Sequence, residues 1–416
     1  MNTYYHLANT RRHPEDVASK KLRTDWLTLS LVAIYFAVFK LVCIPKELQQ
    51  GLKVCCVYFA VLFIVTNLRG SEYRSSSLPF CFMVVVSSLA GYLAGYVDVS
   101  NYTDAIFYAI CLYVLALLIS TCCRTDRIDT FISVFFWMTA LYCALSVVFI
   151  IEVGTSDSSL LYYFAGNKFS TSYYFIMLAC FAFAKMQRGD GNGKAVVLVT
   201  VLLGGLALAV SLKVHCATAA AMSALVIVLA FVPLRVQRVL SSPAVVIAAM
   251  VLTGVILAFL AQILQIPSVR HIVVDVLGKS LTLTGRILIY DALQVVISQS
   301  PVLGYGYGNT VVAMFVGYGN AQNSIMETIV NYGLLGLCAL FYMVWVNIRG
   351  SKAIWSWGMF ILLYAMIVGS VVEITYNYFF FTALMTIAAS RAKRDDVLHA
   401  AEGVCGRPGF KNCARR

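Results

Sequence analysis

Charged residues are scarce in this chain of 416 residues: Asp, Glu, Lys and Arg together make up 12% of it. A typical soluble domain holds about 25% charged residues, because its whole surface faces water. Hydrophobic residues account for 61% of the sequence, and the mean hydropathy is +0.83. So few charges exclude an ordinary soluble enzyme and indicate a protein that is surrounded by lipid.

Several chemical signatures are also missing. The sequence has no P-loop, no dinucleotide-binding glycine fingerprint and no clustered histidines with metal-ligand spacing. These absences argue against a nucleotide-driven pump and an enzyme of nucleotide sugars, and we expect neither metal nor cofactor. The 13 cysteines lie mostly in apolar runs or on the expected cytoplasmic side, so disulfides are not expected. No internal repeat is visible, which disfavours a secondary transporter.

Long apolar runs fill most of the chain. A membrane-spanning helix needs about 20 apolar residues. The sequence predicts spans over residues 26–44, 51–68, 78–97, 104–123, 131–151, 169–186, 195–212, 216–234, 243–265, 323–348, 353–372 and 374–390. We therefore expect an all-α integral membrane protein in which residues 1–416 form one bundle of about 12 transmembrane helices.

The distribution of Lys and Arg orients this bundle. With the N-terminus placed in the cytoplasm, the segments that alternate to the inside hold most cations, including those of a basic tail over residues 391–416. The outer segments hold only Lys46, Lys53, Lys168, Lys213, Arg270, Lys279 and Arg286. This asymmetry follows the positive-inside rule and predicts two cytoplasmic termini. The net charge of +12 is then explained by contact with anionic lipid and requires no nucleic acid.

One outer connection is long, covering residues 266–322. Within it, residues 286–298 predict an amphipathic helix, because Ile289, Leu293 and Val296 recur on one face. A glycine- and tyrosine-rich run that includes Tyr305 follows Pro301. Glycines allow close backbone approach, and tyrosines are common both at sugar-binding surfaces and at membrane interfaces, so both interpretations stay open.

Polar residues gather beside this loop. Asn323, Glu327 and Asn331 recur every four residues and therefore share one helix face, and Glu373 pairs with Asn377 in the same way. An acidic residue near the bilayer is costly and usually functional or paired. The outward-facing basic residues Lys168, Lys213, His215, Arg270, His271, Lys279 and Arg286 suit either an anionic substrate or lipid headgroups.

Two blocks of the sequence resemble a known family. The first runs from Leu277 through Thr282-Leu283-Thr284-Gly285-Arg286 and Tyr290 to Pro301-Val302-Leu303-Gly304-Tyr305-Gly306-Tyr307-Gly308. The second is Asn320-Ala321-Gln322-Asn323-Ser324-Ile325-Met326-Glu327, followed by Tyr332-Gly333-Leu334-Leu335-Gly336-Leu337. Together they are similar to the outer loop and following helix of bacterial exopolysaccharide polymerases, in the O-antigen ligase and polymerase superfamily. The resemblance covers about 65 residues closely, and the rest agrees in topology.

The resemblance implies an enzyme of the bacterial cytoplasmic membrane that transfers a glycan from undecaprenyl diphosphate without metal or nucleotide. It implies a catalytic group of Arg286, Gln322, Asn323 and Glu327, in which Arg286 stabilises the diphosphate. The expected substrate-binding residues are Lys213, His215, Arg270, His271, Lys168, Tyr290, Tyr305 and Glu373. Other polysaccharide assembly proteins are expected partners.

One position departs from the family pattern. The family has a histidine, proposed as the general base, where this chain has Gln322, and glutamine does not accept a proton. Another base can act instead, with the candidates His271, His215, Glu327 and Glu373, or a base can matter little. A polymerase is the leading hypothesis, and a ligase, a lipid-linked sugar flippase and a non-catalytic glycan-binding protein are the alternatives.

Overall fold

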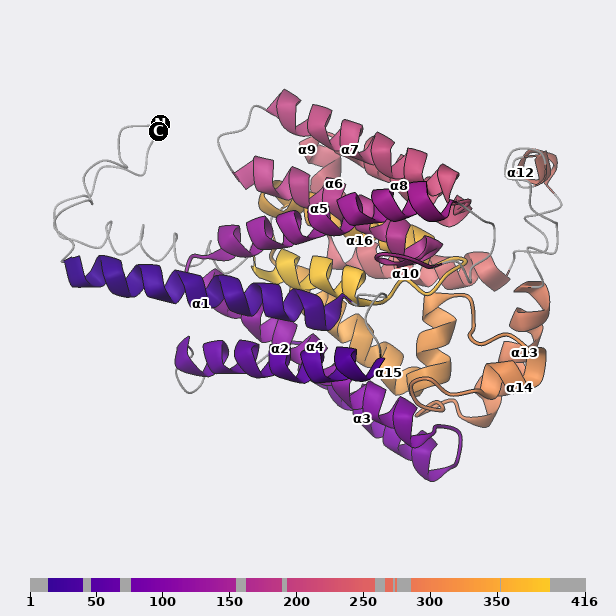
Figure 1. Ribbon diagram of the computed structural model, residues 1–416. Coiled ribbons are helices and arrows are strands. Elements are labelled where there is room, and N and C mark those ends of the chain that lie inside the picture. The colour runs from indigo at the N-terminus through magenta and orange to yellow at the C-terminus, as the bar shows by residue number, and fades with distance from the viewer. Residues whose placement is uncertain are drawn as a thin grey trace, which may run out of the picture.

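The computed structural model describes residues 14–39, 46–67, 76–154, 162–188, 193–258, 266–271, 274, 286–351 and 353–389. These residues form α-helices and one short β-hairpin (Figure 1). The first half of the chain contains α1 (Pro14–Val38), α2 (Lys46–Asn67), α3 (Leu78–Leu93), α4 (Val99–Arg124), α5 (Ile128–Val153), the hairpin of β1 (Tyr162–Tyr163) and β2 (Gly166–Asn167), and α6 (Lys168–Arg188).

The second half begins with α7 (Gly193–Lys213), α8 (Ala217–Ala230), α9 (Leu234–Leu240) and α10 (Pro243–Ala258). In its described residues, the long connection contains α12 (Pro267–His271), α13 (Arg286–Gln299) and α14 (Val311–Val316). The bundle then resumes with α15 (Ser324–Ile348), α16 (Ala353–Gly369) and an apolar helix over Tyr378–Ala389.

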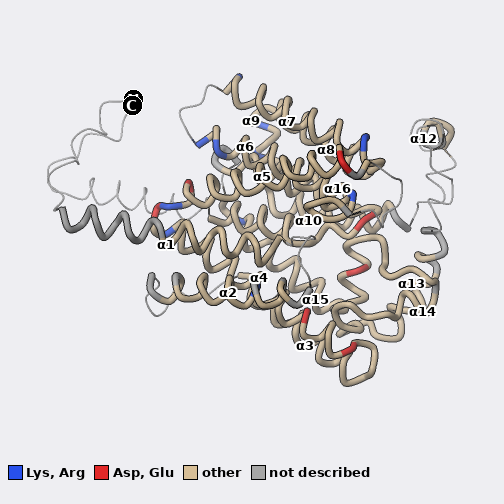
Figure 2. Tube along the Cα trace, viewed as in Figure 1, with Lys and Arg blue, Asp and Glu red and all other residues tan. Residues whose placement is uncertain are grey.

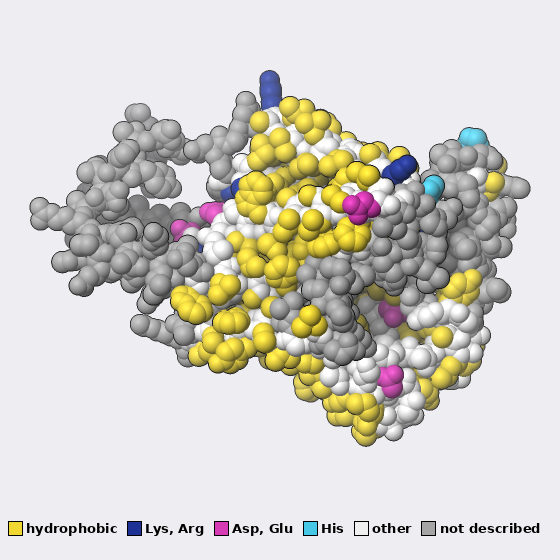
Figure 3. Space-filling view, viewed as in Figure 1, with side chains coloured by type: hydrophobic (Ala, Val, Ile, Leu, Met, Phe, Trp, Pro, Cys, Tyr) yellow, Lys and Arg dark blue, Asp and Glu magenta, His cyan; other side chains and the backbone are white. Residues whose placement is uncertain are grey.

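The helices identify a multi-pass membrane protein. Among the described residues, five helices are long and apolar enough to cross a bilayer, and the bent pair α9–α10 adds a sixth if it forms one span. Apolar side chains cover their outer faces, as on α5 and α7, where Trp137, Leu141, Leu198 and Leu202 are exposed (Figure 3). Exposed surface of this kind is stable against lipid and costly against water.

Two helices lie in the centre of the bundle. In α6, 78% of the apolar window is buried, and in α4 the share is 67%, compared with 28% in each of α5 and α7. Buried aromatic rings fill this centre, including Phe131 beside Phe181, and Tyr174 beside Phe379. The central helices therefore form the core, while α5 and α7 carry the lipid-facing surface.

Several helix ends differ from the expected spans for local reasons. The predicted span 216–234 contracts to α8, which ends at Ala230 shortly before Pro233, a residue that does not continue a helix. The span 353–372 ends earlier, at Gly369, where Ser370 turns back and its hydroxyl donates to the carbonyl of Ile367. The outer part of the span 243–265 lies outside the described residues beyond Ala258.

Short connections make neighbouring helices antiparallel (Figure 1), because the turns 94–98, 125–127 and 214–216 leave no room for a crossover. Residues 94–98, 162–167, 214–216, 286–323 and 370–377 gather at one end, which we call the loop end. Hydrogen bonds join its parts: the Asn101 amide donates to the Gly308 carbonyl, and the Ser324 hydroxyl donates to the Glu373 carbonyl. Charged residues lie mainly near the ends of the bundle (Figure 2).

Candidate functional site

The long connection contains the predicted amphipathic helix. α13 covers Arg286–Gln299, and its residues Ile289, Leu293 and Val296 are buried against Tyr305 and its neighbours. The expected helix over residues 286–298 and its apolar face are thus confirmed. Arg286 is the first residue of α13, but its side chain lies outside the described part, as do the Arg270 side chain and Lys279.

α15 begins with a side-chain cap. The Asn323 carboxamide oxygen accepts hydrogen bonds from the backbone N–H groups of Ile325 and Met326, each at 3.0 Å. Its amide nitrogen donates to the carbonyl of Val371 at 3.3 Å, and the side chain is fully buried. These contacts satisfy helix-end donors and attach α15 to the segment after α16. The structure therefore gives Asn323 a positioning role.

Glu327 sits in the first turn of α15, where the helix dipole favours a negative charge. One carboxylate oxygen accepts from the Ala321 backbone N–H at 2.9 Å, and the other accepts from the Asn331 amide at 3.0 Å. The Asn331 oxygen in turn accepts from the Asn309 amide at 2.8 Å. This chain of bonds fixes the carboxylate between the long connection and α15, and confirms that Glu327 and Asn331 share one helix face.

Gln322 has unusual backbone geometry. Its φ is 53°, in the left-handed region that few residues other than glycine adopt. Its backbone N–H and its side-chain amide both donate to the Asn320 side-chain oxygen, at 3.1 Å and 2.9 Å. The half-buried side chain is thus held beside the start of α15, close in sequence to Glu327. Whether it faces the same cavity as Arg286 stays a prediction, since the Arg286 side chain is not described.

The glycine- and tyrosine-rich run closes a break in α15. At Gly333 the helix is interrupted, with φ 65° and ψ −171°. The carbonyls of Val330 and Asn331 accept from the backbone of Tyr305 and Gly306, each at 2.8 Å. Beyond the break, the N–H groups of Leu334 and Leu335 donate to the carbonyls of Pro301 and Val302. Backbone groups that lose their helical partners within a membrane need other partners, so residues 301–306 stabilise the break in α15. We call this segment the splint.

Tyr305 belongs to this splint. Its ring is buried and packs edge-on against Tyr96, and its hydroxyl donates to the Val296 carbonyl of α13 at 2.7 Å. This packing leaves little surface for a ligand, so the contacts of Tyr305 are structural. Tyr290, also expected to bind substrate, is half-buried on α13 and packs against the same apolar cluster.

Two other predicted residues lie near the same thiol. Lys168 begins α6 and is buried, and Glu373 follows α16. Burial raises the pKa of the Cys216 thiol to about 11. The negative charge of Glu373 contributes to this rise, and the positive charge of Lys168 opposes it. Lys168 and Glu373 thus both lie near Cys216 in the loop end, although they are about 200 positions apart in sequence.

The remaining predicted residues are exposed. Lys213 ends α7, and His215 follows it with a left-handed φ of 55°. His271 ends the short helix α12. The structure thus places Lys213 and His215 in the loop end, next to Cys216 and the pair of Lys168 and Glu373. Within the described residues, no group of three or more His, Cys, Asp and Glu residues has the arrangement of a metal site.

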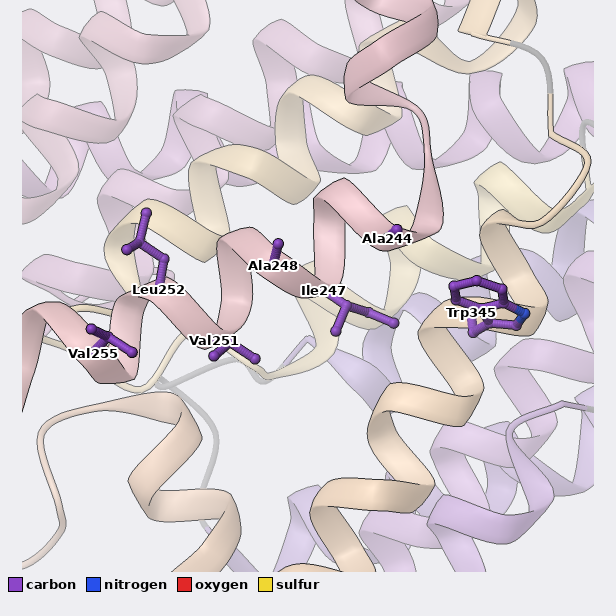
Figure 4. A pocket seen from close by; sticks show the side chains of 7 residues that line it. All are labelled: Ala244, Ile247, Ala248, Val251, Leu252, Val255 and Trp345. Carbon is purple, nitrogen blue, oxygen red and sulfur yellow. The ribbon is translucent and has the colours of Figure 1, made fainter.

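An apolar groove runs between α10 and α15 (Figure 4). Its volume is about 500 Å³, and it is lined by Ala244, Ile247, Ala248, Val251, Leu252, Val255 and Trp345. Next to Val255, a Cβ built at Gly254 would lie 3.7 Å from the Ile325 side chain and 3.9 Å from that of Met326. The end of α10 at which the groove stops therefore lies close to the first turn of α15.

Sequence reasoning missed Asp104 and Tyr332, which border the same region as Glu327. The signal was present for Asp104, because it precedes Tyr108 by four residues and so shares its helix face. No protein-family model matches the chain, and no curated protein matches it.

Proposed function

We propose that this protein is a membrane-embedded glycosyltransferase that polymerises a cell-surface polysaccharide from repeat units carried on undecaprenyl diphosphate. One observation supports the proposal: α15 carries both one wall of an apolar groove that it shares with α10 and, at its start, a polar cluster around Gln322, Asn323 and Glu327. A lipid-linked sugar has the same division into a long apolar tail and a polar head. The tail would lie in the groove, and the head would lie at the loop end.

The sequence motifs support this choice of reaction. The run Thr282-Leu283-Thr284-Gly285-Arg286 and the run from Asn320 to Glu327 resemble exopolysaccharide polymerases of the O-antigen ligase and polymerase superfamily. In the structure, Arg286 opens α13 and the second run leads into α15, so both motifs border helix starts in the long connection. A basic side chain there would meet the diphosphate of the donor.

The reaction would proceed as a displacement at the anomeric carbon of the donor sugar. A hydroxyl of the acceptor forms the new glycosidic bond while the bond from that carbon to the diphosphate breaks. The lipid diphosphate leaves with the bonding electrons, and Arg286, assisted by Lys213 or Arg270, stabilises its charge. The hydroxyl proton passes to a base. Among His271, His215, Glu327 and Glu373, we favour Glu327, because hydrogen bonds fix its carboxylate close to Gln322.

The topology of the proposal has twelve spans in the bacterial cytoplasmic membrane, with both termini in the cytoplasm. Among the described residues, five long apolar helices, or six with the bent pair α9–α10, and six shorter apolar helices support this count. The outward placement of residues 266–322 follows from the asymmetry of Lys and Arg in the sequence.

A lipid-linked sugar flippase is the second candidate, and the break of α15 at Gly333 is the observation that favours it. Broken helices are a feature of transporters. A ligase that moves the finished glycan to another acceptor shares the donor and the chemistry of the polymerase.

Deletion of the gene tests these functions, with the surface glycan and the lipid-linked intermediates measured together. Loss of the polymerase would leave single lipid-linked repeats on the outer face and abolish long chains. Loss of a flippase would instead trap the repeats inside, and loss of a ligase would leave long lipid-linked chains. Normal glycan of normal length in the deletion strain would refute all three.

A further inference from the structure

A second polar group lies between α4 and the long connection. Asn101 of α4 donates to the Gly308 carbonyl at 2.9 Å, and the Tyr108 ring stacks on the Tyr307 ring with centroids 5.5 Å apart and planes at 16°. Asp104 lies between Asn101 and Tyr108 on this helix face. Its carboxylate therefore faces the segment that contains Tyr307 and Gly308.

Glu327 approaches the same place from the opposite side. Glu327 accepts a hydrogen bond from the Asn331 side-chain amide, and the Asn331 backbone carbonyl accepts one from the Gly306 N–H. Tyr307 is the next residue in the chain. Burial, and after it the negative charges of Asp104 and Glu327, raises the pKa of the Tyr307 phenol. Neither carboxylate has an ion-pair partner within the part of the chain that the structure describes. Tyr307 thus lies near two carboxylates, that of Asp104 from α4 and that of Glu327 from α15.

A buried hydroxyl completes the group. Tyr332 is only 5% exposed, and its ring meets Phe80 edge-on at 5.7 Å. Glu327 and the phenols of Tyr108 and Tyr307 all act electrostatically on the Tyr332 phenol. Its hydroxyl forms no hydrogen bond with any described residue, although buried hydroxyls normally have a partner. The Tyr332 phenol is thus an unmatched donor near the Glu327 carboxylate and two further phenols, which indicates a place for a polar ligand.

We propose that Asp104, Tyr108, Tyr307, Glu327 and Tyr332 form a binding site for a sugar ring that is uncharged or carries an amine. Carboxylates only accept hydrogen bonds, and sugar hydroxyls and ammonium groups donate them. Phenols donate and accept, and they match the remaining ring oxygens. A sugar acid would bring a third negative charge without a counter-charge, so the site selects against it. This inference rests on the proposed function where it assigns the ring to the acceptor repeat unit.

Binding of single sugars to the full chain tests the site without turnover. The purified protein in lipid nanodiscs is titrated by saturation-transfer NMR with N-acetylglucosamine, glucosamine and glucuronate. We expect the first two sugars to bind and glucuronate not to bind. Asp104→Asn should weaken glucosamine about tenfold and admit glucuronate, because one repelling charge is removed. Tyr332→Phe, which keeps the ring, should weaken N-acetylglucosamine by about five- to tenfold.

Asp98→Asn is the matched control, because Asp98 caps α4 through the Asn101 N–H and asparagine caps helices equally well. It should bind all three sugars as the wild type does. The site is refuted if no sugar binds the wild type, if glucuronate binds as well as glucosamine, or if Asp104→Asn and Tyr332→Phe both match the control. Sugar binding in a protein whose deletion leaves the polysaccharide unchanged would retain the site and refute the polymerase.

Discussion

Gln322 combines a left-handed backbone with a side chain that does not titrate. A left-handed φ costs on the order of 1–3 kcal/mol for a residue other than glycine. The two hydrogen bonds to Asn320 offset part of this cost, and the turn places the following Asn323 for its cap on α15. Glutamine here can orient a hydroxyl but cannot titrate. In the proposed reaction, the proton acceptor is therefore another group, and Glu327 is fixed one turn away.

Replacement of Gln322 separates orientation from proton transfer. Gln322→His should fold, because histidine tolerates left-handed backbone better than most residues. Its polymer should approach the wild-type level, and activity should rise with pH through about 6.5, as the neutral imidazole becomes available to accept a proton. Glu327→Gln should lower polymer formation by about 10²- to 10⁴-fold. The measurement is the rate of chain growth in membranes as a function of pH.

Asn331→Ala is the control for that experiment. It removes one hydrogen bond to Glu327 but keeps the carboxylate, so it should lose far less activity than Glu327→Gln. Equal losses in the two variants would show that the bond network is needed for structure and that Glu327 is not the base.

Arg286 provides a second test among single residues. Arg286→Lys keeps the positive charge but loses the planar pair of donors that matches phosphate oxygens. We expect at least about a tenfold fall in polymer at a normal protein level, measured by chain-length analysis and immunoblotting. Arg235→Lys on the exposed face of α9 is the control and should change nothing. Polymer at the wild-type level in Arg286→Lys would assign Arg286 to structure or to headgroup contact.

Among the elements, α15 combines features that sequence predicts with features that it does not. The apolar run and the spacing of Asn323, Glu327 and Asn331 predicted the helix and its polar face, because both are local patterns. The break at Gly333 was not predicted, because a helix interior tolerates glycine and the partner segment at residues 301–306 lies about 30 positions away. Likewise, the helical period of its apolar residues predicted α13, whereas the burial of Tyr305 against α13 depends on long-range packing.

The close packing of residues 301–306 against α15 predicts that one methyl group added at Gly333 strongly destabilises the protein. A Cβ at Gly333 would lie 2.0 Å from the Val302 carbonyl oxygen, and φ there is 65°. Gly333→Ala should therefore destabilise the protein by about 3 kcal/mol or more and abolish polymer formation. Gly205→Ala on α7 is the control, since nothing lies within 4 Å of its Cβ, and it should stabilise by about 0.5–1 kcal/mol. Thermal unfolding in detergent compares them, and equal midpoints would contradict the splint.

At the scale of the whole molecule, the lengths of the connections and the distribution of Lys and Arg both predict two distinct ends of the bundle. Short turns force consecutive helices to alternate between the two ends, and the loop end collects the polar groups around Asn323, Lys168 and Asp104. The cations of the sequence separately predict which end faces the cytoplasm, because charge asymmetry depends on counting and not on contacts. The sequence did not predict which polar residues lie near one another. Lys168 and Glu373 both lie near Cys216 because α6, α8 and α16 pack together in the core.

The orientation of the whole molecule is the last prediction. If residues 266–322 lie outside, a cysteine introduced by Ser298→Cys on the exposed face of α13 should react in intact cells with a thiol reagent that does not cross membranes. A cysteine introduced by Ser390→Cys, which follows the helix over Tyr378–Ala389 in sequence, should react only after the cells are opened. The unsubstituted chain gives the baseline for its own cysteines, of which Cys55 and Cys338 are exposed on the helical surface. The reverse pattern would invert every connection and place the loop end, with the proposed diphosphate and sugar sites, in the cytoplasm. An outer-face polymerase would then be impossible, whereas the helix packing around α6 would be unaffected.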